Sequence, residues 1–435
     1  MTILKSVRMD LTAGEEAILN GAQGETMRKI MASVVSYGEL FEAKRLAAVT
    51  GAPHLVISIG AEALKPYYAM LDELIDAGLK IPRPFTVDPR PIDDQIVAQG
   101  LMADQVYRFL LPNQKQYEQQ LQRLGLKDEQ AFTCACYLPE VGNTPQAGDI
   151  LAWSESSAVV FANSVLGART NRNSAGIDLL CNLIGKAPDY GLLTDKGRQA
   201  EWRIDIQTAD LPNPQVLGSA IGLKVLEAVP YITGLDRFLA SRPLEMITAY
   251  LKDMGAAAAS NGAVGLYHVE NITPEARQYG RDLLAAGSPT YRIDDQVLGD
   301  VRRSYPVLWT RDDHRPDICL IGCPHLSLEQ LRDWAKHIPG ELQRQGLEKA
   351  GLLTALCTTP AVLDRFRQYE DEYRRIREAG VALTTICPLM YANNPAVQKT
   401  AVVTNSNKLR TYTMARFFED DDVLDIIVRG VIPEA

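Results

Sequence analysis

The last third of the chain repeats one pattern three times, and this repetition constrains the fold more than any other feature. Each unit has an apolar strand-like run, a short loop and a helix, and the three runs cover residues 317–322, 351–356 and 381–386. Strands that alternate with helices predict a parallel sheet with helices packed on its faces. We therefore expect an α/β protein with several α/β/α domains, in which mostly parallel sheets surround a cleft.

A cysteine follows each of these three strand-like runs: Cys323, Cys357 and Cys387. In an open parallel sheet, ligands bind beyond the carboxyl ends of the strands. Cys323 and Cys387 are each followed by Pro, which ends the strand abruptly and turns the thiol toward the sheet edge. Taken alone, however, a cysteine in such a position is more often a small buried apolar residue than a ligand.

The first two thirds of the chain also alternate strand and helix. Thr12 and Glu15 form a capping-box pattern that predicts a short helix ending at Gly21. Further helices are expected at 25–46 and 61–77, with a strand at 54–59 between them. A chain of 435 residues is long enough for about three domains. We expect these domains at 1–130, 131–300 and 301–435, and we note 212–214 and the alanine-rich run 255–262, a helix end or loop, as further candidate boundaries.

The charge balance narrows the possible partners. The chain has 54 acidic and 45 basic residues and a formal net charge of -9, which repels nucleic-acid backbones and anionic membranes. A small-molecule site is therefore favoured. Charges interrupt the N-terminus before an apolar stretch of signal-peptide length can form, and no run of about 18 apolar residues occurs. We expect a cytoplasmic protein with no nucleic-acid or membrane partner.

The seven cysteines do not read as a disulfide framework, which belongs to short secreted domains. Each must serve either packing or chemistry. No C-x-x-C pair occurs, so the usual zinc and ferredoxin patterns are absent. A cluster site would therefore need cysteines that are distant in sequence, with three thiolates sufficing when one iron is left for substrate.

The densest polar segment covers residues 153–172. It offers a carboxylate, hydroxyls and guanidiniums, which are the groups that clamp a carboxylate substrate. On spacing alone, a capped core helix with a basic C-terminus is an equally good interpretation. Residues 404–408 could likewise hold an anion or form an ordinary turn.

Two histidines and one acidic cluster have mainly structural interpretations. His54 and His268 lie beside strand-like apolar residues, where most histidines are hydrogen-bonded core residues and the rest are acids or bases. The sequence Asp312-Asp313-His314 is more typical of a solvated loop than of a metal site. Neither a dinucleotide-binding nor a P-loop pattern is present.

Several longer motifs, taken together, resemble the large-subunit part of the aconitase X family. They are Thr133-Cys134, residues 152–158 and 162–172, Gly322-Cys323-Pro324-His325, Ile386-Cys387-Pro388, and Thr404-Asn405-Ser406 with Lys408. The resemblance implies an aconitase-like large-subunit architecture. It also implies a hydro-lyase in which three cysteines hold an iron–sulfur cluster, of four-iron or two-iron form, whose free iron binds the leaving hydroxyl.

Matching the motifs residue by residue gives the expected site. The cluster ligands are Cys134, Cys323 and Cys387, which leaves Cys357 for packing. The expected catalytic residues are His54 and Lys408. The expected substrate-binding residues are Glu155, Ser156, Asn163, Ser164, Arg169, Thr170, Asn171, Thr404 and Ser406. In this superfamily a serine on a small swivelling domain is the base, so we expect a separate small swivel-domain subunit as partner.

Three positions depart from the family pattern and bear on the substrate. Cys136 stands where Pro is expected, Asn271 where Gly is usual, and Thr385-Ile386 where an Asp-Thr pair often precedes the last cysteine. We predict the large subunit of an iron–sulfur dehydratase acting on a small hydroxy acid, with cis-3-hydroxy-L-proline favoured because no phosphate cradle is evident. The alternatives are a mevalonate 5-phosphate dehydratase large subunit, a cluster-free binding or regulatory subunit, and a mononuclear metal enzyme using the same cysteines.

Overall fold

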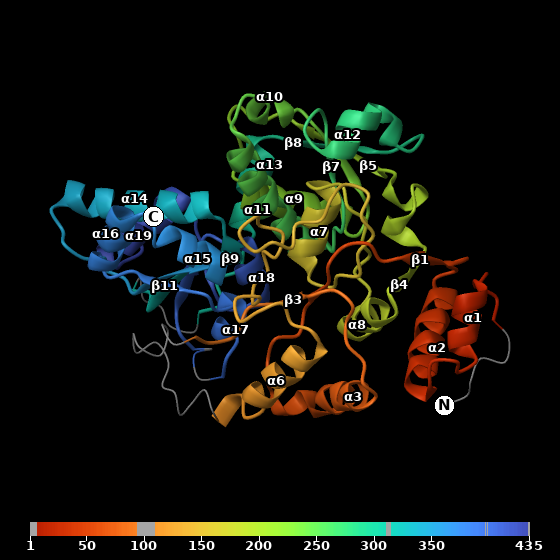
Figure 1. Cartoon of the computed structure of the whole chain (residues 1–435). Helices are drawn as coiled ribbons and strands as arrows, with labels where there is room; N and C mark the ends of the chain where they lie inside the picture. The colour runs from red at the N-terminus through yellow and green to blue at the C-terminus, as the bar shows by residue number, and fades with distance from the viewer. Residues whose placement is uncertain (1–6, 94–108, 310–314, 396, 398, 434–435) are drawn as a thin grey trace.

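Parallel sheets with helices on their faces make up most of the molecule, as the alternating pattern predicted (Figure 1). The computed structural model describes residues 7–93, 109–309, 315–395, 397 and 399–433. In Figure 1 an N-terminal unit, coloured red to yellow, occupies the bottom and centre. A second unit in green and teal lies at the top, and a third unit in blue lies at the left.

The third unit contains a five-stranded parallel sheet with the strand order β11-β10-β9-β12-β13. The first strand lies in the middle and later strands add on either side, so the sheet is doubly wound and its topological switch lies between β9 and β12. Its strands are β9 (Ile318–Leu326), β10 (Thr354–Thr358), β11 (Ala382–Thr384), β12 (Val402–Thr404) and β13 (Arg416–Phe417). Its helices are α14 (Leu328–Gln345), α15 (Pro360–Phe366), α16 (Glu370–Glu378), α17 (Pro388–Ala392), α18 (Asn407–Tyr412) and α19 (Asp420–Arg429).

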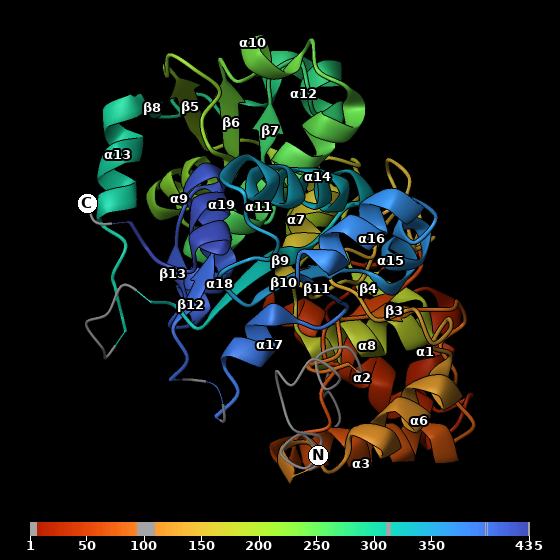
Figure 2. The ribbon, with the colours of Figure 1, turned by 90° about the vertical axis from the view of Figure 1, so that its left-hand side faces the viewer.

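Helices cover both faces of this sheet (Figure 2). Helices α14, α15, α16 and α19 pack on the face that Cys319, Ile321 and Leu356 present. Helices α17 and α18 pack on the opposite face, which includes Cys323 and Cys357. All nine residues of β9 are buried, as expected for a central strand of a parallel sheet covered on both sides.

A register shift near the end of β9 alters the predicted position of two cysteines. Cys323 was expected in a loop and Cys357 after its strand, but the structure places both inside strands, β9 and β10. The pairing changes register between Leu356 and Thr358. Gly322 makes this possible, because its φ is +107° and a Cβ there would lie 2.1 Å from the Cys357 carbonyl oxygen. The strand can therefore continue past the point where the sequence suggested that it ends.

The second unit contains a four-stranded parallel sheet with the order β7-β6-β5-β8. Its strands are β5 (Trp202–Ile206), β6 (Pro230–Thr233), β7 (His268–Val269) and β8 (Thr290–Ile293). Its helices are α9 (Pro214–Val225), α10 (Asp236–Leu239), α11 (Leu244–Gly262), α12 (Pro274–Tyr279) and α13 (Asp295–Arg303).

The alanine-rich run 255–262 is the C-terminal half of α11, so it is a helix end and not a boundary between domains. Small residues are needed there because α11 packs backbone to backbone on α9. A Cβ at Gly218 would lie 2.1 Å from the Met254 carbonyl oxygen, and one at Gly262 would lie 2.1 Å from the Gly222 carbonyl oxygen. This close packing fixes where the C-terminal end of α11 lies.

The N-terminal unit has short strands joined by long connections. Its helices are α1 (Ala13–Leu19), α2 (Glu25–Leu40), α3 (Lys65–Asp76), α6 (Gln114–Leu124), α7 (Ser156–Ser164) and α8 (Ala175–Ile184), with a 3-10 turn at Glu62–Leu64. Its strands are β1 (Leu46–Ala48), β2 (His54–Leu55), β3 (Thr86–Val87) and β4 (Lys186–Pro188). The capping box of Thr12 and Glu15 that predicted α1 is present.

Two predicted elements of this unit are shorter than expected. The helix expected at 25–46 ends at Leu40, since Glu42 takes a left-handed conformation with a φ of +59°. The strand expected at 54–59 is only His54–Leu55, because its partner β3 also has two residues. These segments still form a parallel arrangement, in which Trp153 pairs with His54, β2 with β3, and Val87 with Phe132.

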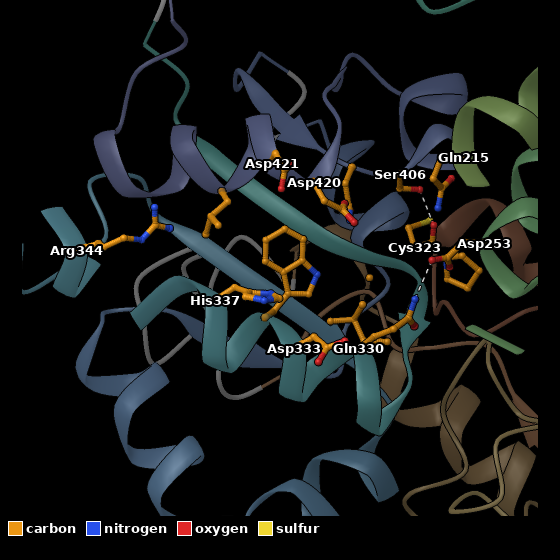
Figure 3. Close-up of a pocket in the computed structure, with 16 residues that line it drawn as sticks. Gln215, Asp253, Cys323, Gln330, Asp333, His337, Arg344, Ser406, Asp420 and Asp421 are labelled. Carbon is orange, nitrogen blue, oxygen red and sulfur yellow. Dashed lines mark hydrogen bonds between the residues drawn. The ribbon is translucent and has the colours of Figure 1, made fainter. Parts of the chain in front are cut away.

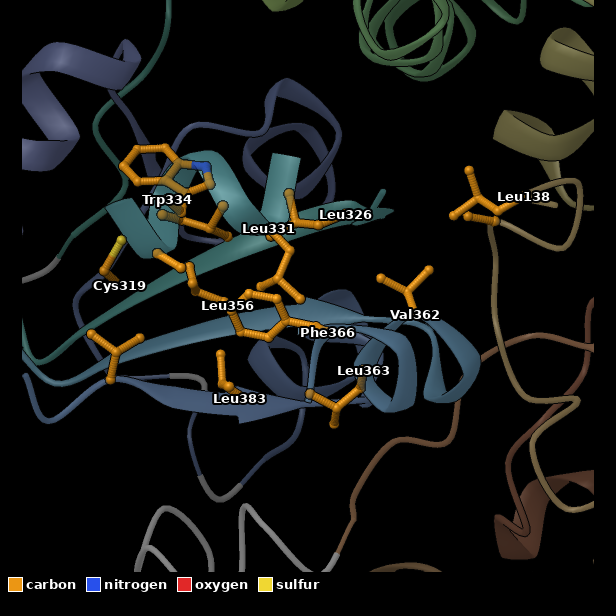
Figure 4. Packing of buried hydrophobic residues seen from close by; sticks show 14 of the residues in the cluster. Leu138, Cys319, Leu326, Leu331, Trp334, Leu356, Val362, Leu363, Phe366 and Leu383 are labelled. Atoms are coloured by element: carbon orange, nitrogen blue, oxygen red, sulfur yellow. The ribbon is translucent and has the colours of Figure 1, made fainter. Parts of the chain in front are cut away.

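One apolar core joins the first and third units. It includes Tyr137, Trp153 and Phe161 from the first unit and the residues of β9, β10, α14 and α15 from the third. Figure 4 shows Phe366 and Leu356 at its centre, with Leu138 of the first unit at one side. Burying a side chain of this size contributes about 1.5–3 kcal/mol, so the two units form one packed body. No helix in the described ranges is both long and apolar enough to cross a bilayer. The domain borders expected near 130 and 300 stay predictions.

Candidate active site

Residues that follow the strands of two units line one cleft with a volume of about 560 Å³. Asp88 follows β3 and Glu155 follows the paired Trp153, whereas Lys408 lies on α18 beyond β12. The position beyond the carboxyl ends of parallel strands is where open α/β sheets bind ligands. The remaining lining residues are Val56, Ser154, Ser156, Arg172, Leu226, 259–263, Leu389 and Tyr412.

An ion pair joins the two sides of this cleft. Lys408 Nζ donates a hydrogen bond of 2.5 Å to Glu155 Oε1, and both side chains are largely buried. Glu155 is also the N-cap of α7, and its Oε2 accepts hydrogen bonds from the Ser157 hydroxyl and the Ala158 N–H. Burial opposes the charge of Glu155, but Lys408 and these hydrogen bonds outweigh it and lower the pKa of Glu155 to about 2. Glu155 in turn raises the pKa of Lys408 against the effect of burial.

A second pair lies at the floor of the cleft. His54 Nε2 lies 3.2 Å from Asp88 Oδ1, and His54 Nδ1 lies 3.0 Å from Thr86 Oγ1. His54 is fully buried against Trp153 and reaches the cleft only through Asp88. Burial raises the pKa of Asp88 to about 6, although the hydrogen bond with His54 acts in the opposite direction. Burial by itself lowers the pKa of His54, but Cys136 and Asp88 outweigh it and raise that pKa.

The three cysteines expected to bind a cluster lie close to this cleft. Cys134 follows the Phe132 segment beside β3, Cys323 lies at the register shift of β9, and Cys387 is the N-cap of α17. Cys323 is near enough to influence the pKa of both Cys134 and Cys387. The charges of Glu155 and Lys408 act on both Cys134 and Cys323. The fold therefore brings together three thiols from three distant segments.

The chemistry of these thiols fits an iron–sulfur cluster. All seven cysteines are free, and burial raises the pKa of Cys323 to about 11, that of Cys387 to about 12 and that of Cys134 well above its usual value. Such thiols stay protonated until a metal replaces their protons. Three cysteines can hold a cluster with one iron free for substrate. Within the described ranges, no three His, Cys, Asp or Glu side chains gather closely enough to hold one metal ion.

The predicted substrate-binding residues divide into three groups. Glu155 and Ser156 line the cleft, together with the predicted catalytic residue Lys408. The others from residues 163–171 lie in the wall behind it, where their polar atoms bond to the protein itself. The partners are Gly265 O for Asn163, Tyr267 N for Ser164, Trp153 N for Thr170, Tyr190 O for Asn171, and Asp195 and Leu193 O for Arg169. Their contact with substrate stays a prediction. In the structure, their hydrogen bonds and ion pair connect segments of the cleft wall.

Ser406 lines a second cavity of about 460 Å³, shown in Figure 3, and Thr404 precedes it by two residues. Thr404 donates to the Leu320 carbonyl, and Ser406 donates to the Cys323 carbonyl at one end of this cavity. In Figure 3 the cavity extends from there to Arg344, with Asp420 and Asp421 of α19 across from His337 of α14. It lies at the topological switch between β9 and β12, and Cys323 is among its lining residues.

Sequence reasoning missed several cleft residues. Asp88 and Asn261 line the cleft but were not assigned to the site, whereas Ser154 and Arg172 belong to the polar segment 153–172 that the sequence indicated. The signal for Asp88 was its place directly before Pro89 and after a short apolar run, which marks the carboxyl end of a strand. The predicted structural role of His268 is consistent with its hydrogen bond of 2.9 Å to the Arg198 carbonyl. Asp312-Asp313-His314 lies outside the described residues.

Comparisons with known proteins identify the family. Models of the aconitase X first, second and third domains match residues 8–196, 199–303 and 316–419. The phosphomevalonate dehydratase large subunit of Thermococcus kodakarensis is 34% identical, over 75% of this chain and 77% of that protein. The cis-3-hydroxy-L-proline dehydratase of Pseudomonas aeruginosa is 30% identical, over 75% of this chain and 53% of that protein.

A solved structure is similar over nearly the whole length. The crystal structure of Thermococcus kodakaraensis aconitase X in its holo-form superposes with a TM-score of 0.78 at 28% identity, covering 97% of this chain and 100% of that one. The fold and the site thus define a multi-domain α/β protein of aconitase-like architecture, as the resemblance implied. More specifically, the chain belongs to the aconitase X family.

Proposed function

We propose that this chain is the large subunit of an iron–sulfur hydro-lyase that removes water from a small hydroxy acid. Hydro-lyase activity follows from its family, whose curated relatives are named dehydratases. The observation that supports the cluster is the convergence of three free thiols, one buried and two partly buried, beside the Glu155–Lys408 cleft. Because all seven cysteines are free thiols, we also place the protein in the reducing cytoplasm.

Removing water from a hydroxy acid needs a base for the proton beside the carboxylate and assistance for a poor leaving group. A cluster held by Cys134, Cys323 and Cys387 would supply a Lewis acid for the hydroxyl. The protein's own residues supply the remaining functions. Lys408 stands where it can bind the substrate carboxylate and stabilise the negative charge that develops there. Asp88, backed by His54, can deliver a proton to the departing hydroxyl.

The mouth of the cleft supports a small-subunit partner. Leu226 is 61% exposed and Tyr412 is 48% exposed, and both line the cleft. Leu226 also has a φ of +57°, a strained conformation for a residue other than Gly. A strained backbone that holds an apolar side chain in solvent at a site's edge is typical of a surface that a partner covers. We propose that the small swivel-domain subunit, which brings the serine base, docks here and closes the cleft.

The electrostatics of the cleft favour an amino-acid substrate such as cis-3-hydroxy-L-proline. The C-terminal end of the long helix α11, at 259–263, borders the cleft and carries the negative end of the helix dipole. This negative end suits the ring ammonium. Arg172 and Lys408 are the cations of the lining, and Lys408 is also paired with Glu155. Two cations, one of them shared with Glu155, are enough for a substrate carboxylate but few for an additional phosphate.

Mevalonate 5-phosphate is the second candidate substrate. The observation in its favour is sequence similarity, since the phosphomevalonate dehydratase large subunit of Methanosarcina mazei is 30% identical over 93% of this chain and 92% of that protein. The two substrates are best compared directly, with the large subunit and its small partner, by following the dehydrated product. Turnover of the phosphate compound alone would reject the amino-acid assignment and leave the hydro-lyase proposal intact.

The cluster is tested by iron and acid-labile sulfide per chain after anaerobic purification and reconstitution. We expect Cys134→Ala, Cys323→Ala and Cys387→Ala to lose both elements and Cys357→Ala to keep them. Cys357 is a matched control because it is also buried and lies in the neighbouring strand β10. A wild-type chain without iron, beside a related enzyme reconstituted in parallel, would reject the dehydratase proposal and favour the cluster-free binding subunit.

A further inference from the structure

His325 lies next to the three-cysteine site and contacts the segments that carry two of the cysteines. Its side chain is completely buried. Nδ1 lies 3.2 Å from the Thr133 hydroxyl, one residue before Cys134, and Nε2 lies 2.9 Å from the carbonyl oxygen of Ile386, one residue before Cys387. His325 itself follows Cys323 by two residues. One imidazole ring therefore connects all three ligand segments.

The hydrogen-bond partners assign a single tautomer to this ring. A carbonyl oxygen can only accept, so Nε2 carries the proton and donates to Ile386. Nδ1 must then accept from the Thr133 hydroxyl, whose oxygen accepts in turn from the Ala135 N–H at 3.0 Å. This continuous chain of donors and acceptors orients the loop on both sides of Cys134.

The backbone of His325 makes two further contacts with the site. Its N–H donates to Cys134 Sγ at 3.4 Å. Its carbonyl accepts a hydrogen bond of 2.8 Å from Lys252 Nζ, a buried ammonium on α11 that also acts electrostatically on Cys323. Residue 325 thus bonds to all three units of the fold, and Lys252 places a positive charge where three thiolates would concentrate negative charge.

We infer that His325 is the positioning residue of the three-cysteine site, and that its ring and backbone, with Lys252 behind them, set where the thiols stand relative to one another. This inference rests on the proposed function, since it assigns residues that hold the cluster's ligands. Groups that orient metal ligands from behind typically change metal retention by about 10–100-fold when removed. Among the described residues, none that bonds directly to His325 lines the cleft, so its role is to hold ligands and not to touch substrate.

The test is the rate at which a chelator removes iron from the reconstituted protein. We expect His325→Leu to lose iron about 10-fold faster than wild type. His325→Gln should fall between them, because its amide nitrogen can still donate to the Ile386 carbonyl. His268→Leu is the matched control: His268 is equally buried and bonds to a carbonyl, that of Arg198, in the second unit. The melting temperature of each cluster-free variant separates loss of folding from loss of ligand placement.

A second measurement detects the charge of Lys252. Lys252→Met should lower the midpoint potential of the bound cluster, followed by electron paramagnetic resonance, and Lys252→Arg should leave it near the wild-type value. Iron loss from His325→Leu at the wild-type rate, or no faster than from His268→Leu, would overturn the inference while the proposed function stands. Failure of the wild type to take up iron would overturn both.

Discussion

Lys408 Nζ lies 2.5 Å from Glu155 Oε1, although the two residues are 253 positions apart. The ammonium belongs to α18 of the third unit, and the carboxylate caps α7 of the first unit. The ion pair therefore connects the two units across the cleft. A buried pair of this kind stabilises relative to its broken form, because removing one partner leaves the other charged and unpaired.

Glu155→Gln should destabilise the free chain by about 3 kcal/mol at neutral pH. The pKa of Glu155 is lowered to about 2, so the stabilisation is complete above the ordinary pKa of 4.5 and is lost as the pH falls from 4.5 toward 2. Urea unfolding of both proteins at several pH values measures this. The stability difference should shrink with acid. Glu25→Gln, which breaks an exposed pair with Arg28, is the control and should change the stability far less than Glu155→Gln.

Gly322→Ala should destabilise the third unit and the cysteine site together. A Cβ at this position would meet the Cys357 carbonyl oxygen at 2.1 Å, and the φ of +107° disfavours any L side chain. Strain and overpacking of this kind cost about 2–4 kcal/mol in sum. Thermal unfolding and iron per chain report the two effects. Gly340→Ala, inside α14 with open space around it, should instead stabilise slightly. Equal behaviour of the two variants would contradict the close approach.

Cys323 lies in a part of the fold that the sequence predicts well, whereas Asp88 lies in a part that it does not. The third unit has long apolar runs with a regular period, so its parallel sheet and the edge that carries Cys323 and Cys387 could be read directly. The ends of β9 and β10 could not be predicted. Cys323 and Cys357 stay inside these strands because of a register shift, and this shift depends on the close approach of Gly322 to the neighbouring strand. Such a contact is tertiary and leaves no periodic signal.

Asp88 escaped prediction for a different reason. Strands β2 and β3 have two residues each and their outer partners are single bridges, too short for alternation to be recognised. The pairing of Glu155 with Lys408 was also invisible, since local spacing carries no information about contacts over 253 positions. The family motifs pointed to residues 163–171 as a group, although the fold places most of them behind the cleft wall.

Asp88→Asn should lower kcat of the two-subunit complex by about 10²–10⁴-fold, the usual range for a general acid. The pKa of Asp88 is raised to about 6 by burial, so the donor loses its proton as the pH rises through that value. The wild-type profile of kcat/KM should therefore fall with rising pH on a limb near 6, and this limb should vanish in Asp88→Asn. His54→Gln should shift the limb without abolishing it, because His54 acts through Asp88. An unchanged profile in Asp88→Asn would assign the proton to another group.

Leu226 tests the partner surface, because backbone strain and side-chain exposure can be varied separately there. Leu226→Gly relieves the positive φ and should stabilise the free large subunit by about 1 kcal/mol. It also removes the exposed side chain, so affinity for the small subunit should fall about 10-fold, equivalent to roughly 1.4 kcal/mol. Leu226→Asp should weaken binding further. Leu244→Asp serves as the control, because Leu244 is comparably exposed and lies at the N-terminal end of α11, whereas the cleft borders the C-terminal end of that helix. Calorimetric titration with the small subunit and thermal unfolding of the free chain measure the two effects, and wild-type affinity in both Leu226 variants would place the partner elsewhere.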